Sequence, residues 1–127
     1  MLRSLQFELE FEVAKAILHL IGGNPAALDF SVFQSLIVER NFAGSGFSVN
    51  LTKSPLLAFP TSEKRVCTDS IHAVVNNQLA VMFMAFCDDG FMDFFEGCTY
   101  GELWPQPIDA FQIFTVAEIN AFFRRQK

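Results

Sequence analysis

The chain has 127 residues, of which 51% are hydrophobic and 18% are charged, and 16 are phenylalanine. This length predicts a single domain, residues 1–127, that buries about two-thirds of the surface exposed by its unfolded form. The composition excludes an intrinsically disordered protein. The net charge of −5 disfavours direct binding to nucleic acid or to an anionic membrane surface, because their phosphate groups would be repelled.

The charge is distributed unevenly along the chain. Residues 66–123 contain eight Asp and Glu residues and no Lys or Arg, so this stretch sums to −8. The remaining residues carry six acidic and nine basic side chains and sum to +3. The negative field of residues 66–123 attracts a basic protein or a cation.

The cysteines are Cys67, Cys87 and Cys98. Their odd number, the lack of a paired-cysteine motif and the lack of a signal-peptide pattern predict a reduced, cytoplasmic setting. The apolar runs are too short to span a bilayer, so we expect no membrane segment.

Two helices are predicted in the N-terminal part. Hydrophobic and polar residues alternate from Leu5, which indicates a short extended segment before a helix over about residues 10–21. Gly22 and Gly23 would end that helix. Asn24 followed by Pro25 predicts the start of a second helix, and the β-branched residues after Leu36 indicate a change to strand there.

Five later segments have the pattern of β-strands, namely residues 47–51, 70–75, 79–87, 91–98 and 110–114. Asn76-Asn77 and Asp89-Gly90 are turn sequences, so three of these strands should form an antiparallel meander. Residues 52–64 predict a long loop.

A capping box at Thr115 and Glu118 indicates a C-terminal helix. We therefore predict an α+β fold, with an antiparallel sheet of about five strands, two N-terminal helices and one C-terminal helix.

Glu96 is a candidate functional carboxylate. A two-residue loop at Asp89-Gly90 would place Phe83 opposite Glu96 and Cys87 opposite Met92. Glu96 would then have apolar neighbours, and burial would raise its pKa, as proton transfer requires. The alternative is that Glu96 ends its strand and binds backbone amides of residues 99–104.

Metal and cofactor sites are not predicted. The spacing of Asp88, Asp89 and Asp93 differs from that of a calcium loop, and turn preference explains the first two. Neither His19 nor His72 has a companion at metal-ligand spacing.

The only tyrosine and the only tryptophan, Tyr100 and Trp104, flank Gly101 and Glu102 in a loop that Pro105 ends. Both side chain types favour interfaces, so the loop is a candidate binding element. The same two aromatics could instead hold the loop against the body of the protein.

Two stretches resemble a family of small uncharacterised bacterial proteins. Residues 44–47 form a Gly-x-Gly-Phe motif, and residues 95–105 match the signature Leu-Glu-Gly-x-Thr-Tyr-x-Glu-x-Trp-Pro, with Phe95 in place of leucine. The resemblance covers about residues 40–105. It implies kinship and no particular chemistry.

In size and acidity the chain is also similar to immunity proteins of bacterial toxin systems, including contact-dependent inhibition. Many toxin domains that cleave nucleic acid are basic, and complementary charge accelerates their association with an acidic inhibitor. We therefore predict a non-enzymatic protein, a monomer or weak homodimer, that binds a cognate basic toxin domain. The predicted contact residues are Asp88, Asp89, Asp93, Tyr100, Glu102 and Trp104. The alternative is a small-ligand or enzymatic site centred on Glu96, with Tyr100 and Trp104 at its mouth.

Overall fold

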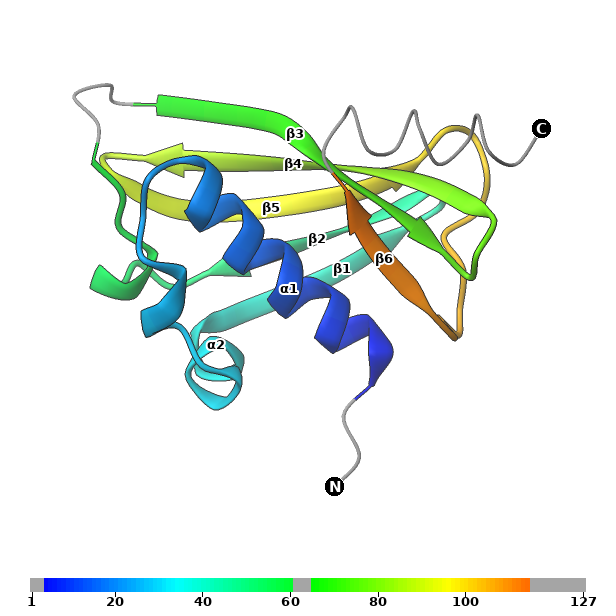
Figure 1. Ribbon diagram of the computed structural model, residues 1–127, viewed down its shortest axis with the longest axis horizontal. Coiled ribbons are helices and arrows are strands. Elements are labelled where there is room, and N and C mark those ends of the chain that lie inside the picture. The colour runs from blue at the N-terminus through cyan, green and yellow to red at the C-terminus, as the bar shows by residue number, and fades with distance from the viewer. Residues whose placement is uncertain (1–3, 61–64, 115–127) are drawn as a thin grey trace.

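The computed structural model describes residues 4–60 and 65–114, without the side chains of 66–70. In this part the chain forms one open antiparallel sheet with the strand order β1-β2-β5-β4-β3-β6, together with two α-helices (Figure 1). The helices are α1 (Leu5–Leu20) and α2 (Phe30–Leu36). The strands are β1 (Ile37–Ala43), β2 (Gly46–Leu51), β3 (Arg65–Val75), β4 (Leu79–Asp88), β5 (Phe91–Thr99) and β6 (Phe111–Phe114). The predicted α+β class is confirmed, with six strands in place of five.

Helix α1 begins five residues earlier than predicted. The Ser4 side chain accepts a hydrogen bond from the backbone N–H of Phe7 at 3.1 Å and caps the helix, so the predicted extended segment from Leu5 is wrong. The alternation in this region reflects a wide buried face, because Leu9, Glu10 and Phe11 are all buried. A helix that is covered over so much of its circumference loses the narrow apolar stripe that identifies it in a sequence.

The second helix is shorter than predicted. Asn24 makes no side-chain capping bond, and Pro25 begins only a three-residue 3₁₀ turn, η1 (Pro25–Ala27). Helix α2 starts at Phe30 because the Asp29 carboxylate accepts a hydrogen bond from Val32 N at 2.8 Å. This bond and one from Ser31 hold the pKa of Asp29 below its usual value.

The change from helix to strand near Leu36 is confirmed. Strand β1 begins at Ile37 and lies at the edge of the sheet, paired with β2 alone. Strand β1 is the one missing from the five strand segments predicted from the sequence. The predicted C-terminal helix from Thr115 lies outside the described residues.

The meander of β3, β4 and β5 is confirmed. Asn76 and Asn77 have φ values of 54° and 63°, and Asp89 and Gly90 have φ values of 52° and 85°, as tight hairpin turns require.

The register between β4 and β5 is only partly as predicted. Cys87 pairs with Met92, but the next pairs are Phe86 with Phe94 and Met84 with Glu96, because Asp93 forms a β-bulge. A shift of one residue moves a side chain to the other face of the sheet. Glu96 therefore lies on the face away from the buried Phe83, and the predicted pairing of these two residues is wrong.

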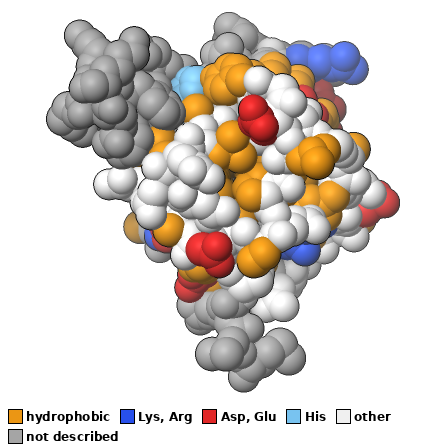
Figure 2. All heavy atoms as spheres, turned by 90° about the vertical axis from the view of Figure 1, so that its right-hand side faces the viewer, with side chains coloured by type: hydrophobic (Ala, Val, Ile, Leu, Met, Phe, Trp, Pro, Cys, Tyr) orange, Lys and Arg blue, Asp and Glu red, His pale blue; other side chains and the backbone are white. Residues whose placement is uncertain are grey.

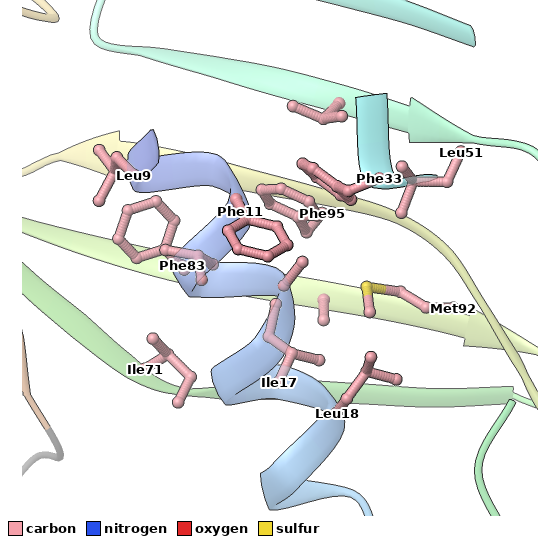
Figure 3. Packing of buried hydrophobic residues seen from close by; sticks show 14 of the residues in the cluster. Leu9, Phe11, Ile17, Leu18, Phe33, Leu51, Ile71, Phe83, Met92 and Phe95 are labelled. Atoms are coloured by element: carbon pink, nitrogen blue, oxygen red, sulfur yellow. The ribbon is translucent and has the colours of Figure 1, made fainter. Parts of the chain in front are cut away.

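Helix α1 crosses one face of the sheet, and the hydrophobic core lies between them (Figures 1 and 3). The helix contributes Leu9, Ile17 and Leu18 to this core. The strands contribute Phe83, Met92 and Phe95, whose side chains meet those of the helix (Figure 3). Among the described residues, no helix is both long enough and apolar enough to cross a membrane.

An ion pair inside the protein joins α1 to the edge strand β1. Glu10 is 0% exposed, and its carboxylate accepts hydrogen bonds from Arg40 Nε at 2.6 Å and from Arg40 Nη2. Gln6 Nε2 donates a third bond to Glu10 at 2.8 Å. A buried carboxylate needs such partners because it has lost its hydration. The hydrogen bonds that Arg40 donates to Glu10 raise the pKa of Arg40, which stays charged throughout the accessible pH range.

The Arg40→Met substitution should destabilise the protein by about 3 kcal/mol, because it leaves the buried Glu10 carboxylate without its cation. Urea unfolding measures the loss. The matched control is Lys15→Met, which removes a surface ion pair with Glu12 and should cost less than about 1 kcal/mol. Equal losses for the two variants would contradict the structural role of the buried pair.

Candidate functional site

The two stretches of the resemblance, residues 44–47 and 95–105, form one unit at the end of β5. Trp104 N donates a hydrogen bond to Gly44 O at 3.0 Å, and Thr99 N donates one to Ser45 O at 2.9 Å. The turn between β1 and β2 and the segment that follows β5 accordingly lie at the same end of the molecule (Figure 1). The turn thus supports the loop that carries the tyrosine and the tryptophan.

Gly97 makes this unit compact. A Cβ atom at this position would lie 2.6 Å from the Phe83 ring and 2.8 Å from the Phe47 ring, both far inside van der Waals contact. The space left by Gly97 allows Phe47 to pack between Phe83 and Trp104, with ring centroids 6.3 Å and 4.6 Å away. The motif glycine therefore has a packing role.

Trp104 anchors the loop from inside. It is only 7% exposed, and its Nε1 donates a hydrogen bond to Gln6 Oε1 at 3.0 Å. Gln6 in turn donates to Glu10, so hydrogen bonds lead from the loop through α1 to the Glu10–Arg40 pair. Of the two roles predicted for the aromatics, Trp104 has that of holding the loop, and it offers a partner little surface.

Tyr100 and Glu102 point to solvent. Tyr100 is 63% exposed, Leu103 in the same loop is 78% exposed, and Phe42 on β1 is 45% exposed. Glu102 is exposed among them, and its backbone carbonyl accepts a hydrogen bond from the Thr99 hydroxyl, which closes the loop. Figure 2 shows this end of the molecule, where hydrophobic side chains gather with acidic side chains among them.

Sequence reasoning missed Phe42 and Leu103 as surface residues. Phe42 lies opposite Phe47, and their ring centroids are 5.9 Å apart. Its place on an edge strand leaves part of the ring in solvent. For Leu103, the sequence signal that could have predicted its exposure is a large aliphatic residue within a polar loop. Its neighbour Trp104 is the residue of this loop that is buried. Large apolar side chains left exposed at one end of a molecule are candidates for an interaction site.

The predicted acidic contact residues Asp88, Asp89 and Asp93 are exposed at the other end of β5. Two basic residues lie beside them. Arg65 Nε is 4.0 Å from Asp88, and Lys53 lies with its Nζ 4.6 Å from the Phe91 ring centroid. Lys53 and the three aspartates line one small hollow of about 80 Å³.

The structure therefore does not bring this acidic turn together with Tyr100 and Glu102. It also supplies the turn with cations from outside residues 66–123. The negative field predicted from the sequence is weaker here than the local composition implies.

Glu96 lies on the sheet face opposite to that of Trp104. It pairs with Ser48 and Met84, whereas Trp104 packs on Phe47 on the α1 side. The predicted constellation with Trp104 at the mouth of a site around Glu96 is therefore not formed. Glu96 also makes no hydrogen bond to the described backbone amides of residues 99–104, where the Thr99 hydroxyl closes the loop.

No group of three or more His, Cys, Asp or Glu residues in the described part of the chain is arranged to hold a metal ion. Comparisons with protein-family models, with curated protein sequences and with solved structures gave no match to this chain. The assignment of a function therefore depends on the geometry of the site.

Replacing Gln6 with leucine should loosen the loop, because the indole N–H of Trp104 and the Glu10 carboxylate each lose a hydrogen-bond partner. We expect a loss of about 1–2 kcal/mol in the free energy of unfolding. Trp104 is the only tryptophan, so its fluorescence emission, blue-shifted by burial, reports directly on the loop and should shift to the red. The exposed Gln34 provides the control variant Gln34→Leu, which should leave the emission unchanged. An unchanged spectrum and stability in Gln6→Leu would show that this bond does not hold the loop.

Proposed function

We propose that this protein is an immunity-type inhibitor that binds a basic toxin domain through the end of the sheet where β5 terminates. The observation that carries the proposal is the exposure of Tyr100, Glu102 and Leu103 in the loop after β5 and of Phe42 near the end of β1. We name this set of four residues the terminal surface. Exposed aromatic side chains are typical of protein–protein interfaces, and charged groups are typical of the interface rim.

The way the loop is held supports a binding role. Its backbone is tied to Gly44 and Ser45, and Trp104 fixes it from the inner side. A loop that is already ordered loses little conformational entropy when a partner binds, so more of the contact energy appears as affinity. Tyrosine adds contact area at low entropic cost because it has few rotatable bonds.

The charge of the terminal surface favours a basic partner. Glu102 is exposed there, whereas the guanidinium of Arg40, the basic residue of β1, is held by Glu10. An unpaired exposed carboxylate contributes to long-range attraction and to the association rate. We assign a smaller part to Asp88, Asp89 and Asp93, because Arg65 and Lys53 lie beside them.

The test uses the protein domain encoded immediately upstream of this gene, since an immunity gene characteristically follows its toxin gene. Co-expression of the present chain should restore growth to cells that produce the upstream domain, and the two purified proteins should form a complex. If that domain is neither bound nor neutralised, the proposal is wrong.

Charge reversal of Glu102 to lysine should slow association with that domain by about tenfold at low salt and change dissociation less. Stopped-flow fluorescence of Trp104, which belongs to the same loop, follows the association reaction. The matched variant Asp89→Lys carries the same charge change at the other end of β5 and should have a smaller effect. An equal or larger effect of Asp89→Lys would move the contact surface to the acidic turn.

A further inference from the structure

A hollow of about 270 Å³ lies at the end of the sheet where β5 terminates, and its row of Asn41, Ser48 and Glu96 is on the face away from α1. Its polar lining consists of Asn41, Ser45, Ser48 and Glu96, of which Asn41, Ser48 and Glu96 lie on paired strands. Its remaining lining includes the small residues Ala43 and Gly46. The hollow is thus a depression with hydrogen-bonding groups along one side.

The strand register explains the arrangement. Asn41 pairs with Ser48, and Ser48 pairs with Glu96, so the three polar side chains form one row across β1, β2 and β5. Neighbours in such a row have Cβ atoms about 5 Å apart. The adjacent row consists of Ala43, Gly46 and Cys98, which have little or no side chain, and this leaves the space.

Tyr100 lies one residue beyond the end of β5, the strand from which Glu96 and Cys98 line the hollow. It follows Cys98 by two residues, and burial together with the charge of the Cys98 thiolate raises the pKa of its phenol. Burial and the nearby Glu96 carboxylate likewise raise the pKa of Cys98. Successive residues at a spacing of two lie on the same face of a strand, so Glu96 and Cys98 share one face of β5 and Tyr100 follows at the same spacing. The charge couplings agree with this placement.

The Glu96 carboxylate is partly buried, and the described residues supply it with no ion pair or hydrogen bond. Among the residues that the structure describes, no lysine or arginine lines the hollow. A carboxylate with an amide oxygen and a hydroxyl in the same row offers several acceptors to one cation. A guanidinium group matches such a row because it is planar and has five N–H donors, whereas an ammonium group is a compact charge.

We infer that this hollow receives an arginine side chain of the binding partner, with the guanidinium paired to Glu96 and its plane against the ring of Tyr100. The inference rests on the proposed function, which requires a basic partner. It adds the chemical group that is recognised and a second contact beside the terminal surface. Stacking of a cation on an aromatic ring and a charge-assisted bond are interactions typical of interface hot spots.

The test needs no partner protein. The isolated chain is titrated with N-acetyl-arginine methylamide while amide chemical shifts are followed by nuclear magnetic resonance. Saturable shifts should be confined to residues 41–48 and 96–100, with a Kd on the order of 10 mM for so small a probe. The corresponding lysine derivative should bind several-fold more weakly, and the neutral isostere N-acetyl-citrulline methylamide should not bind.

Glu96→Gln is nearly isosteric, should fold normally and should abolish the saturable shifts, and Tyr100→Leu should weaken binding several-fold. Glu39→Gln is the matched control, because Glu39 pairs with Asn50 in the neighbouring row and is exposed. It should bind the arginine probe as the original chain does.

Binding of citrulline equal to that of arginine, retention of binding in Glu96→Gln, or no saturable shift would each overturn the inference. Shifts centred on Asp88 and Asp89 would also overturn it, because they would show general attraction to acidic surface. A positive titration with no binding to the upstream-encoded domain would leave the arginine site standing and refute the proposed partner. If the upstream-encoded domain binds but the arginine probe gives no saturable shifts, the proposed partner is supported and the arginine site is refuted.

Discussion

The Glu10–Arg40 ion pair is the constraint on which the position of the loop after β5 depends. Apolar burial between α1 and the sheet provides most of the driving force for folding, but it has little directionality. A carboxylate with no exposed surface requires its partners at defined positions, so it fixes how α1 lies against the edge strand β1. Gln6 extends the same network to the indole of Trp104. One helix thereby places both the edge strand and the loop that ends β5.

The residues of this loop divide by role. Gly97 leaves room for two phenylalanine rings, Thr99 closes the loop, and Trp104 attaches it to α1. These three positions are accounted for by the fold. Tyr100 and Glu102 contribute to no comparable internal contact and face solvent, so they are the positions through which we propose that the loop contacts a partner.

Much of the sheet could be predicted from local sequence. The turns at Asn76-Asn77 and Asp89-Gly90 need positive φ values, which these residue types tolerate, so the hairpins were readable. The bulge at Asp93 could not be predicted from local sequence, although it decides which face of the sheet Glu96 occupies.

The site was predictable in part. The single tyrosine and tryptophan identified the loop, but the burial of Trp104 depends on Gln6, almost one hundred residues earlier in the chain. The proximity of Arg65 to Asp88 likewise follows from strand pairing between distant segments. Charge summed along a sequence window therefore overstated the acidity of the turn. Contacts of this kind arise from the topology and leave no local pattern.

The central claim, that partners bind at the end of the molecule where β5 terminates, is tested most directly by hydrogen exchange of the free protein and of its complex with the upstream-encoded domain. Slower exchange on binding should appear in residues 41–46 and 96–104. Slower exchange confined to residues 88–93, or no change in the two predicted segments, would contradict the account.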